Sequence, residues 1–143
     1  MSTTAPSITD TARAFFDACD AGQGWEACSA YCTPGATFAS QAEPLAELRT
    51  VQEYADWMVG LMTLLPDGAA TVKSFGTDHE RGNVCVYGVF AGTHTGEGGP
   101  VAPTGKHVAA DYVYAMDFDG GLISHVTKIW NAPWTLRELG WTD

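Results

Sequence analysis

The sequence predicts an α+β fold in which helices come first and a largely antiparallel sheet follows. Apolar residues recur at helical spacing over residues 8–65 and alternate with polar residues after Pro66-Asp67-Gly68, so the period changes there from ~3.6 to ~2. The 143 residues suffice for one domain with one core, and they contain no internal repeat, low-complexity tract or linker. We therefore expect a single domain over 1–143, with residues 1–6 flexible and a curved sheet wrapped on the N-terminal helices around a cavity.

Capping signals predict the helices. Ser7-Ile8-Thr9-Asp10 places a serine N-cap before an apolar stripe that stops at Gly22. Thr50-Val51-Gln52-Glu53 is a second capping box, and it opens the strongest amphipathic helix of the chain. Between these helices the sequence predicts, in order, a short helix at 25–32 ended by Pro34-Gly35, a short strand at 36–39, and a loop with one helical turn at 40–49.

The second half of the chain reads as strands separated by turn signals. Asp119-Gly120-Gly121 predicts a tight hairpin turn, and residues 80–83 predict another. The expected strands are 70–77, 84–93, 106–118 and 122–131, followed by a final helical turn at 134–139.

Composition excludes several classes of partner. The formal net charge is −10, and the acidic residues are scattered, so nucleic acid and anionic membranes are not expected to bind. No run of 18 apolar residues and no signal peptide are visible, which makes the cytoplasm the expected location. The four cysteines fit reduced thiols in apolar patterns, and their spacing is not that of a zinc site, so no metal is expected.

The register of the last hairpin decides which side chains face the cavity. A two-residue loop would place Lys128 opposite Asp111. A three-residue loop, which we favour, places Lys128 opposite Tyr112 and puts Asp111 on the other face. The inward face then gathers large amphipathic rings around the lysine, which suits a half-wet pocket: Tyr112, Tyr114, Met116, Val126, Lys128 and Trp130.

Lys128 has two interpretations at this point. A lysine on an inward face is unfavourable unless it is paired, and if it is desolvated its pKa falls and it can act as a proton donor or electrophile. Alternatively, it is a lysine near the end of a strand that reaches water.

The glycine-rich loop "GTHTGEGGP" at residues 92–100 also has two interpretations. Its histidine, His94, lies at the end of a long strand and can reach the rim of the cavity as a proton carrier. Alternatively, His94 and the neighbouring threonines hydrogen-bond the backbone of their own loop.

These motifs together resemble a known family. The segments "ARAFFDA", "GTHTGE", "PTGK", "DYVYAMDFDGG", "KIWN" and "LRELG" are similar to the SnoaL-like polyketide cyclase branch of the nuclear transport factor 2-like superfamily. The resemblance covers about residues 12–140. It implies a conical pocket between a curved sheet and three helices, and a homodimer.

The resemblance also implies site positions that this chain fills with other residue types. The histidine and aspartate that do acid–base work in the resembling cyclases fall on Tyr114 and Lys128. In the resembling ketosteroid isomerases the general base falls near Ser40 and the acidic oxyanion donor on Tyr114, while Trp130 falls on a pocket tryptophan. The scaffold therefore matches while the catalytic residue types differ.

Two functional hypotheses follow. The first is an enzyme without a cofactor that cyclises, isomerises or dehydrates a small, apolar or polyketide-like carbonyl compound by acid–base chemistry. The second is a non-catalytic small-ligand-binding domain with the same cavity. For the enzyme, the candidate catalytic residues are Tyr114, Lys128, His94 and Asp111, and the candidate substrate-binding residues are Phe16, Tyr31, Trp57, Tyr112, Met116 and Trp130. No nucleotide-binding, serine-hydrolase or zinc-protease motif is present.

Overall fold

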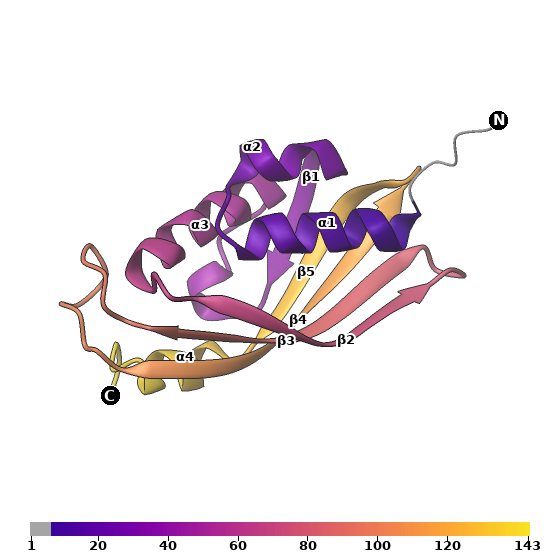
Figure 1. The fold of residues 1–143 in the computed structure, drawn as a ribbon. Helices are drawn as coiled ribbons and strands as arrows, with labels where there is room; N and C mark the ends of the chain where they lie inside the picture. The colour runs from indigo at the N-terminus through magenta and orange to yellow at the C-terminus, as the bar shows by residue number, and fades with distance from the viewer. Residues whose placement is uncertain (1–6) are drawn as a thin grey trace.

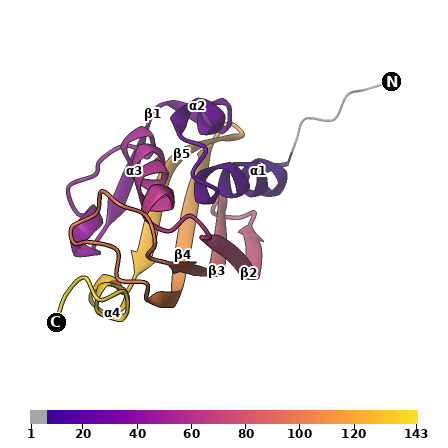
Figure 2. The same cartoon turned by 60° about the vertical axis from the view of Figure 1, so that its left-hand side comes forward.

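A five-stranded mixed sheet carries helices on one side. The computed structural model describes residues 7–143. Figures 1 and 2 show α1, α2 and α3 together on one side of the sheet and α4 at one end of it. The elements in chain order are α1 (Ile8–Asp20), α2 (Trp25–Cys28), the 3-10 turn η1 (Ser29–Tyr31), β1 (Cys32–Ser40), the 3-10 turn η2 (Glu43–Leu45), α3 (Val51–Leu64), β2 (Ala69–Asp78), β3 (Asn83–Thr93), β4 (His107–Asp119), β5 (Leu122–Trp130) and α4 (Ala132–Glu138).

The sheet is open, with strand order β1-β5-β4-β3-β2. The pairs β2–β3, β3–β4 and β4–β5 are antiparallel, whereas β1 lies parallel to β5 at one edge. The expected α+β class and the mixed sheet on N-terminal helices are confirmed. The expectation that residues 1–6 are flexible lies outside the described residues.

The predicted caps start the two long helices. The Ser7 side chain accepts a hydrogen bond from the backbone N–H of Asp10 at 3.1 Å and starts α1. At α3 the capping box is complete, because Thr50 accepts from the backbone of Glu53 at 3.1 Å and Glu53 accepts from the backbone of Thr50 at 3.0 Å. Each cap satisfies helix N–H groups that have no partner within the helix.

The segment after α2 differs from the prediction. The helix predicted at 25–32 ends at Cys28, and after one 3-10 turn the chain is already in β1 at Cys32. Pro34 and Gly35, expected to end a helix, lie inside the strand. β1 tolerates them because it is an edge strand whose pairing with β5 shifts between Cys32 and Thr37.

The last hairpin has neither of the registers considered from the sequence. Asp119 pairs with Leu122 around Gly120-Gly121, and the ladder then shifts by one residue before Asp117 pairs with His125. Lys128 consequently lies opposite Tyr114, two residues from the favoured partner Tyr112. A two-residue difference preserves the face of every side chain, so the predicted inward face is correct although the pairing is wrong.

No helix in residues 7–143 combines the length and the apolar character needed to cross a membrane.

Candidate active site

A cavity of about 490 Å³ lies between α3, the inner face of β4 and β5, and the C-terminal segment. Most of its wall is apolar, and three polar side chains come together in it: Asp20, Tyr112 and Lys128. A large apolar cavity with a few convergent polar groups is the usual form of a small-molecule site. The remaining lining residues are Pro44, Trp57, Met58, Gly60, Leu61, Thr63, Leu64, Leu65, Phe90, Gly98, Pro100, Val108, Ala110, Trp130, Thr135, Leu136, Leu139 and Trp141.

Lys128 is buried, with 7% of its surface exposed, so the interpretation of a lysine that reaches water is wrong. Its ammonium donates a hydrogen bond to the hydroxyl oxygen of Tyr54 at 2.9 Å. Burial lowers the pKa of Lys128 to about 8, although the Asp20 carboxylate acts in the opposite direction. Aromatic faces attract cations, and five rings surround Nζ with centroids at 4.9–5.9 Å: those of Tyr54, Trp57, Tyr112, Tyr114 and Trp130.

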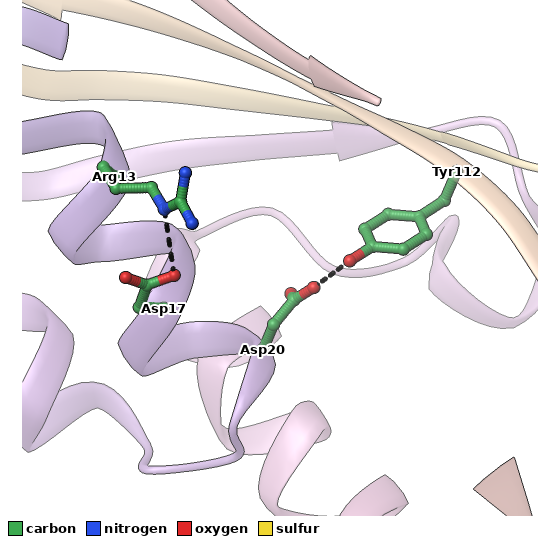
Figure 3. Close-up of polar contacts among 4 residues, drawn as sticks. All are labelled: Arg13, Asp17, Asp20 and Tyr112. Carbon is green, nitrogen blue, oxygen red and sulfur yellow. Dashed lines mark hydrogen bonds and ion pairs between the residues drawn. The ribbon is translucent and has the colours of Figure 1, made fainter. Parts of the chain in front are cut away.

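Asp20 supplies the opposite charge. It is the last residue of α1 and is 5% exposed. Its two carboxylate oxygens accept hydrogen bonds from the hydroxyls of Tyr112 and Tyr114, and Figure 3 shows the bond to Tyr112. Burial raises the pKa of Asp20, while Lys128 and the two tyrosine hydrogen bonds partly offset this effect. The C-terminal end of a helix is also an unfavourable place for a negative charge.

A continuous hydrogen-bonded chain joins the two charges. Because the Tyr114 hydroxyl donates to Asp20, the 2.5 Å bond between Tyr54 and Tyr114 has Tyr54 as its donor. Each hydroxyl therefore donates toward the carboxylate, and the chain runs from Lys128 through Tyr54 and Tyr114 to Asp20. Burial raises the pKa values of Tyr54 and Tyr114, which keeps both as neutral hydroxyls.

The predicted aromatic residues divide into two groups. Trp57, Tyr112 and Trp130 line the cavity. Phe16, Tyr31 and Met116 do not line it. Phe16 is buried and stacks on Tyr112 with ring centroids 6.3 Å apart, Met116 is fully buried, and Tyr31 is half-buried against the core. Tyr114 is also fully enclosed and does not line the cavity; it meets the site through its hydroxyl partners and through the contact of its ring with the Lys128 ammonium.

His94 lies outside the wall of the cavity. It is fully buried, and its Nδ1 accepts hydrogen bonds from the Trp141 indole at 2.8 Å and from the Thr104 backbone at 3.3 Å. The neutral ring therefore carries its proton on Nε2. Trp141 lines the cavity and His94 does not, so His94 fastens the C-terminal segment to the loop between β3 and β4. The bond from the Thr104 backbone fits the local interpretation for His94, whereas the Thr93 hydroxyl bonds the side chains of Asp67 and His107 instead of the loop backbone. A role of His94 as a proton carrier at the rim does not fit this geometry.

Asp111 faces away from the cavity. Its side chain is exposed on the outer face of β4 and accepts a hydrogen bond from the Tyr87 hydroxyl at 3.0 Å. Side chains alternate between faces along a strand, so its neighbour Tyr112 points inward while Asp111 cannot reach a ligand there.

Sequence patterns do not single out Asp20, because it follows a helical stripe as a single carboxylate near a helix end. Its signal was spacing: Asp20 is four residues after Phe16 and therefore shares the buried face of α1. A carboxylate on an apolar face needs a partner, and Lys128 is the unpaired cation on the facing side of the sheet.

The cysteines do not form a metal site. In residues 7–143, no group of three or more histidine, cysteine, aspartate or glutamate side chains is placed to hold a metal ion. Cys19 and Cys28 are both buried free thiols.

Comparison with protein families identifies the family of the chain. The model of the SnoaL-like polyketide cyclases matches residues 10–139, nearly the whole described chain. The chain belongs to the SnoaL-like polyketide cyclase family. The resemblance seen in the sequence is thereby confirmed. No protein with a curated description matches the sequence.

Solved structures share the SnoaL-like fold with low sequence identity. AclR from Streptomyces galilaeus, a proposed hydroxylase, is 20% identical with a TM-score of 0.76, over 95% of this chain and 86% of that one. IdmH from Streptomyces antibioticus, a proposed polyketide cyclase, is 20% identical with a TM-score of 0.75, over 94% and 99% of the two chains. A proposed SnoaL-like cyclase from Jannaschia sp. CCS1 is 15% identical with a TM-score of 0.75 and covers both chains fully. At these identities the likeness establishes the fold.

Proposed function

We propose that this SnoaL-like protein is an enzyme that works without a cofactor and catalyses acid–base chemistry on a small, largely apolar carbonyl compound. One observation carries the proposal: a buried carboxylate and a buried ammonium line the same apolar cavity. Burying two charges is unfavourable for stability, and perturbed titratable pairs in cavities are typical of active sites.

The roles follow from the arrangement. The Asp20 carboxylate removes a proton from the carbon next to the substrate carbonyl, and the C–H electron pair becomes the C=C bond of an enolate while the carbonyl pair moves to oxygen. The Lys128 ammonium stabilises that oxyanion. Once protonated, Asp20 no longer needs both tyrosine hydrogen bonds, so the Tyr112 hydroxyl is free to donate to the oxyanion as well.

The same enolate leads to each of the three reactions expected from the sequence. Where the enolate is conjugated with a further C=C bond, return of the proton from Asp20 to the far carbon completes an isomerisation. Where the substrate has a β-hydroxyl group, that group takes the proton from Asp20 and leaves as water while the enolate electron pair forms the new C=C bond, which completes a dehydration. Where a second carbonyl is within reach, attack by the enolate carbon closes a ring, and the resulting alkoxide takes the proton from Asp20. Tyr114 and Tyr54 are enclosed and act as positioning residues, since they link the two charges without reaching the cavity.

The test is catalysed exchange of solvent deuterium. We expect the wild-type protein to accelerate exchange at the carbon next to the carbonyl in some members of a panel of one- to three-ring aromatic ketones and β-diketones, followed by proton NMR in D₂O. Asp20→Asn and Lys128→Met should each lower the rate by about 100-fold or more, the usual contribution of an acid–base group.

Matched controls distinguish loss of a catalytic group from a nonspecific effect of removing a charged side chain. Asp117→Asn on the outer side of β4 and Lys73→Met on β2 change exposed residues of the same types and should leave exchange unchanged. If Asp20→Asn and Lys128→Met exchange as fast as the wild type, the assignment of these residues is wrong.

A binding protein without turnover is the second candidate. It is favoured by the fact that both Asp20 oxygens and the Lys128 ammonium already have hydrogen-bond partners within the chain. Native mass spectrometry that finds a bound ketone, with no exchange above the uncatalysed rate for any bound compound, would favour this candidate over the enzyme.

The expected homodimer belongs to the same proposal. The outer face of the last hairpin exposes Ile129 by 62% and Leu122 by 37%, and a second copy covering this face would remove apolar surface from water. Light scattering coupled to size-exclusion chromatography measures the mass directly, and a monomer at all concentrations would exclude the dimer.

A further inference from the structure

A second cavity, of about 470 Å³, lies between α1 and β2. It is more polar than the main cavity, and its three charged side chains, Arg13, Asp17 and Asp20, all come from α1 (Figure 3). Its lining residues are Arg13, Phe16, Asp17, Asp20, Ala21, Met62, Gly68, Ala69, Ala70 and Val72.

Asp20 is the one residue that lines both cavities in the described part of the chain. Lys128 and Tyr112 line only the main cavity, and Phe16 lines only the second. The carboxylate therefore forms part of the wall between the two, with one side toward a ligand and the other toward the space beneath α1.

The second cavity leads from Asp20 to solvent along polar groups. Arg13 and Asp17, which lie two helical turns and one helical turn before Asp20, form a 3.3 Å ion pair with side chains 53% and 61% exposed. Exposed charges at one end and a buried carboxylate at the other give water several hydrogen-bond partners, and the volume holds many more than one water molecule. The cavity thus suits water better than a second apolar ligand.

We propose that the second cavity is the route through which Asp20 exchanges its proton with bulk water while the main cavity holds a ligand. The protonated carboxyl gives its proton to a water molecule in this cavity, which returns Asp20 to the carboxylate and passes the proton as hydronium to solvent. The reverse step reloads Asp20. In this arrangement the active site resets without release of the ligand.

The importance of the route for turnover rests on the proposed function, but its existence does not. A measurement that needs no turnover can therefore test it. The Tyr114 hydroxyl donates to Asp20 and lines neither cavity, so its rate of hydrogen exchange with solvent reports how readily water reaches the carboxylate. This rate is accessible by NMR of protein labelled with ¹³C at the tyrosine ring carbon that bears oxygen, in mixed H₂O and D₂O.

Two identical substitutions distinguish the routes. Ala70 on β2 and Ala110 on β4 are the two cross-strand neighbours of Phe90, and each lines one cavity. Ala70→Phe partly fills the second cavity and Ala110→Phe partly fills the main one. We expect Ala70→Phe to slow exchange of the Tyr114 hydroxyl by about tenfold, as a barrier raised by ~1.4 kcal/mol does, and Ala110→Phe to change it less than about twofold.

Every other pattern overturns the proposal. Slowing by Ala110→Phe alone would place the water route in the main cavity, and equal effects or none would mean that exchange occurs through wider opening of the fold. Val72→Phe fills the second cavity from another position on β2 and replaces Ala70→Phe if that variant does not fold. Failure of the ketone exchange assay would leave this result intact, so the two proposals fail separately.

Discussion

The burial of Lys128 makes a quantitative prediction about stability. The pKa of its amine falls from 10.5 to about 8 in the folded chain. A lysine with a depressed pKa destabilises the fold wherever it is charged, because the unfolded chain binds the proton more tightly. The cost is complete below pH 8 and fades as the pH rises toward 10.5. It amounts to about 3 kcal/mol at pH 7 and about 1 kcal/mol at pH 10.

Comparison with Lys128→Met isolates this contribution, because methionine has a similar length and no charge. We expect the free energy of unfolding of the wild type to rise by about 2 kcal/mol relative to Lys128→Met between pH 7 and pH 10. Urea denaturation followed by tryptophan fluorescence at each pH measures the difference.

The Asp20→Asn background provides the control, since it removes the titration of Asp20 from both proteins. In that background the difference in unfolding free energy between Lys128 and Lys128→Met should depend more strongly on pH, because the carboxylate that raises the pKa of Lys128 is absent. A difference that stays flat from pH 7 to pH 10 would mean that Lys128 titrates equally in the folded and unfolded chains, and the argument from burial would be refuted.

Three further predictions concern single contacts. Tyr54→Phe removes the hydrogen-bond acceptor of the Lys128 ammonium and should lower the pKa of Lys128 below about 8, measured by NMR of a labelled amine; an unchanged pKa would remove Tyr54 from the chain of hydrogen bonds. Trp141→Phe loses the bond to His94 and should speed amide exchange in α4, with a loss of stability of about 1 kcal/mol; unchanged protection would show that packing alone holds this end. Thr50→Ala should lower the free energy of unfolding by about 1 kcal/mol in urea denaturation; no loss would contradict the capping role.

The sequence predicts best what depends on neighbours along the chain. The caps at Ser7 and Thr50 and the inward face of β4 and β5 follow from local spacing, and the structure confirms them. The pairing of Tyr114 with Lys128 does not follow, because it depends on a shift of the ladder next to the Gly120-Gly121 turn that no local pattern indicates.

The candidate site depends even more on contacts between distant parts of the chain, which local sequence patterns do not indicate. Lys128 is visible as an unusual inward cation, but its partner Asp20 is 108 positions earlier in the numbering and looks like an ordinary residue near a helix end. His94 and Asp111 could both transfer protons, but neither lies where it could reach a ligand in the main cavity. His94 is hydrogen-bonded to Trp141, and Asp111 lies on the outer face of β4. Residue type predicts what a side chain can do, whereas only the tertiary fold decides which side chains meet.

The parallel pairing of β1 with β5 bears on how the protein is made. Ser40 hydrogen-bonds Lys128, which is 88 residues later in the chain, and Asp20 hydrogen-bonds Tyr114, which is 94 residues later. Such distant contacts slow folding, and a chain emerging from the ribosome cannot form them until β4 and β5 have been synthesised. A nascent chain that ends before β5 contains the acidic half of the site without its cation. The two charges therefore come together only when nearly the entire polypeptide is present, and truncated products should fail to fold instead of accumulating as partly active species.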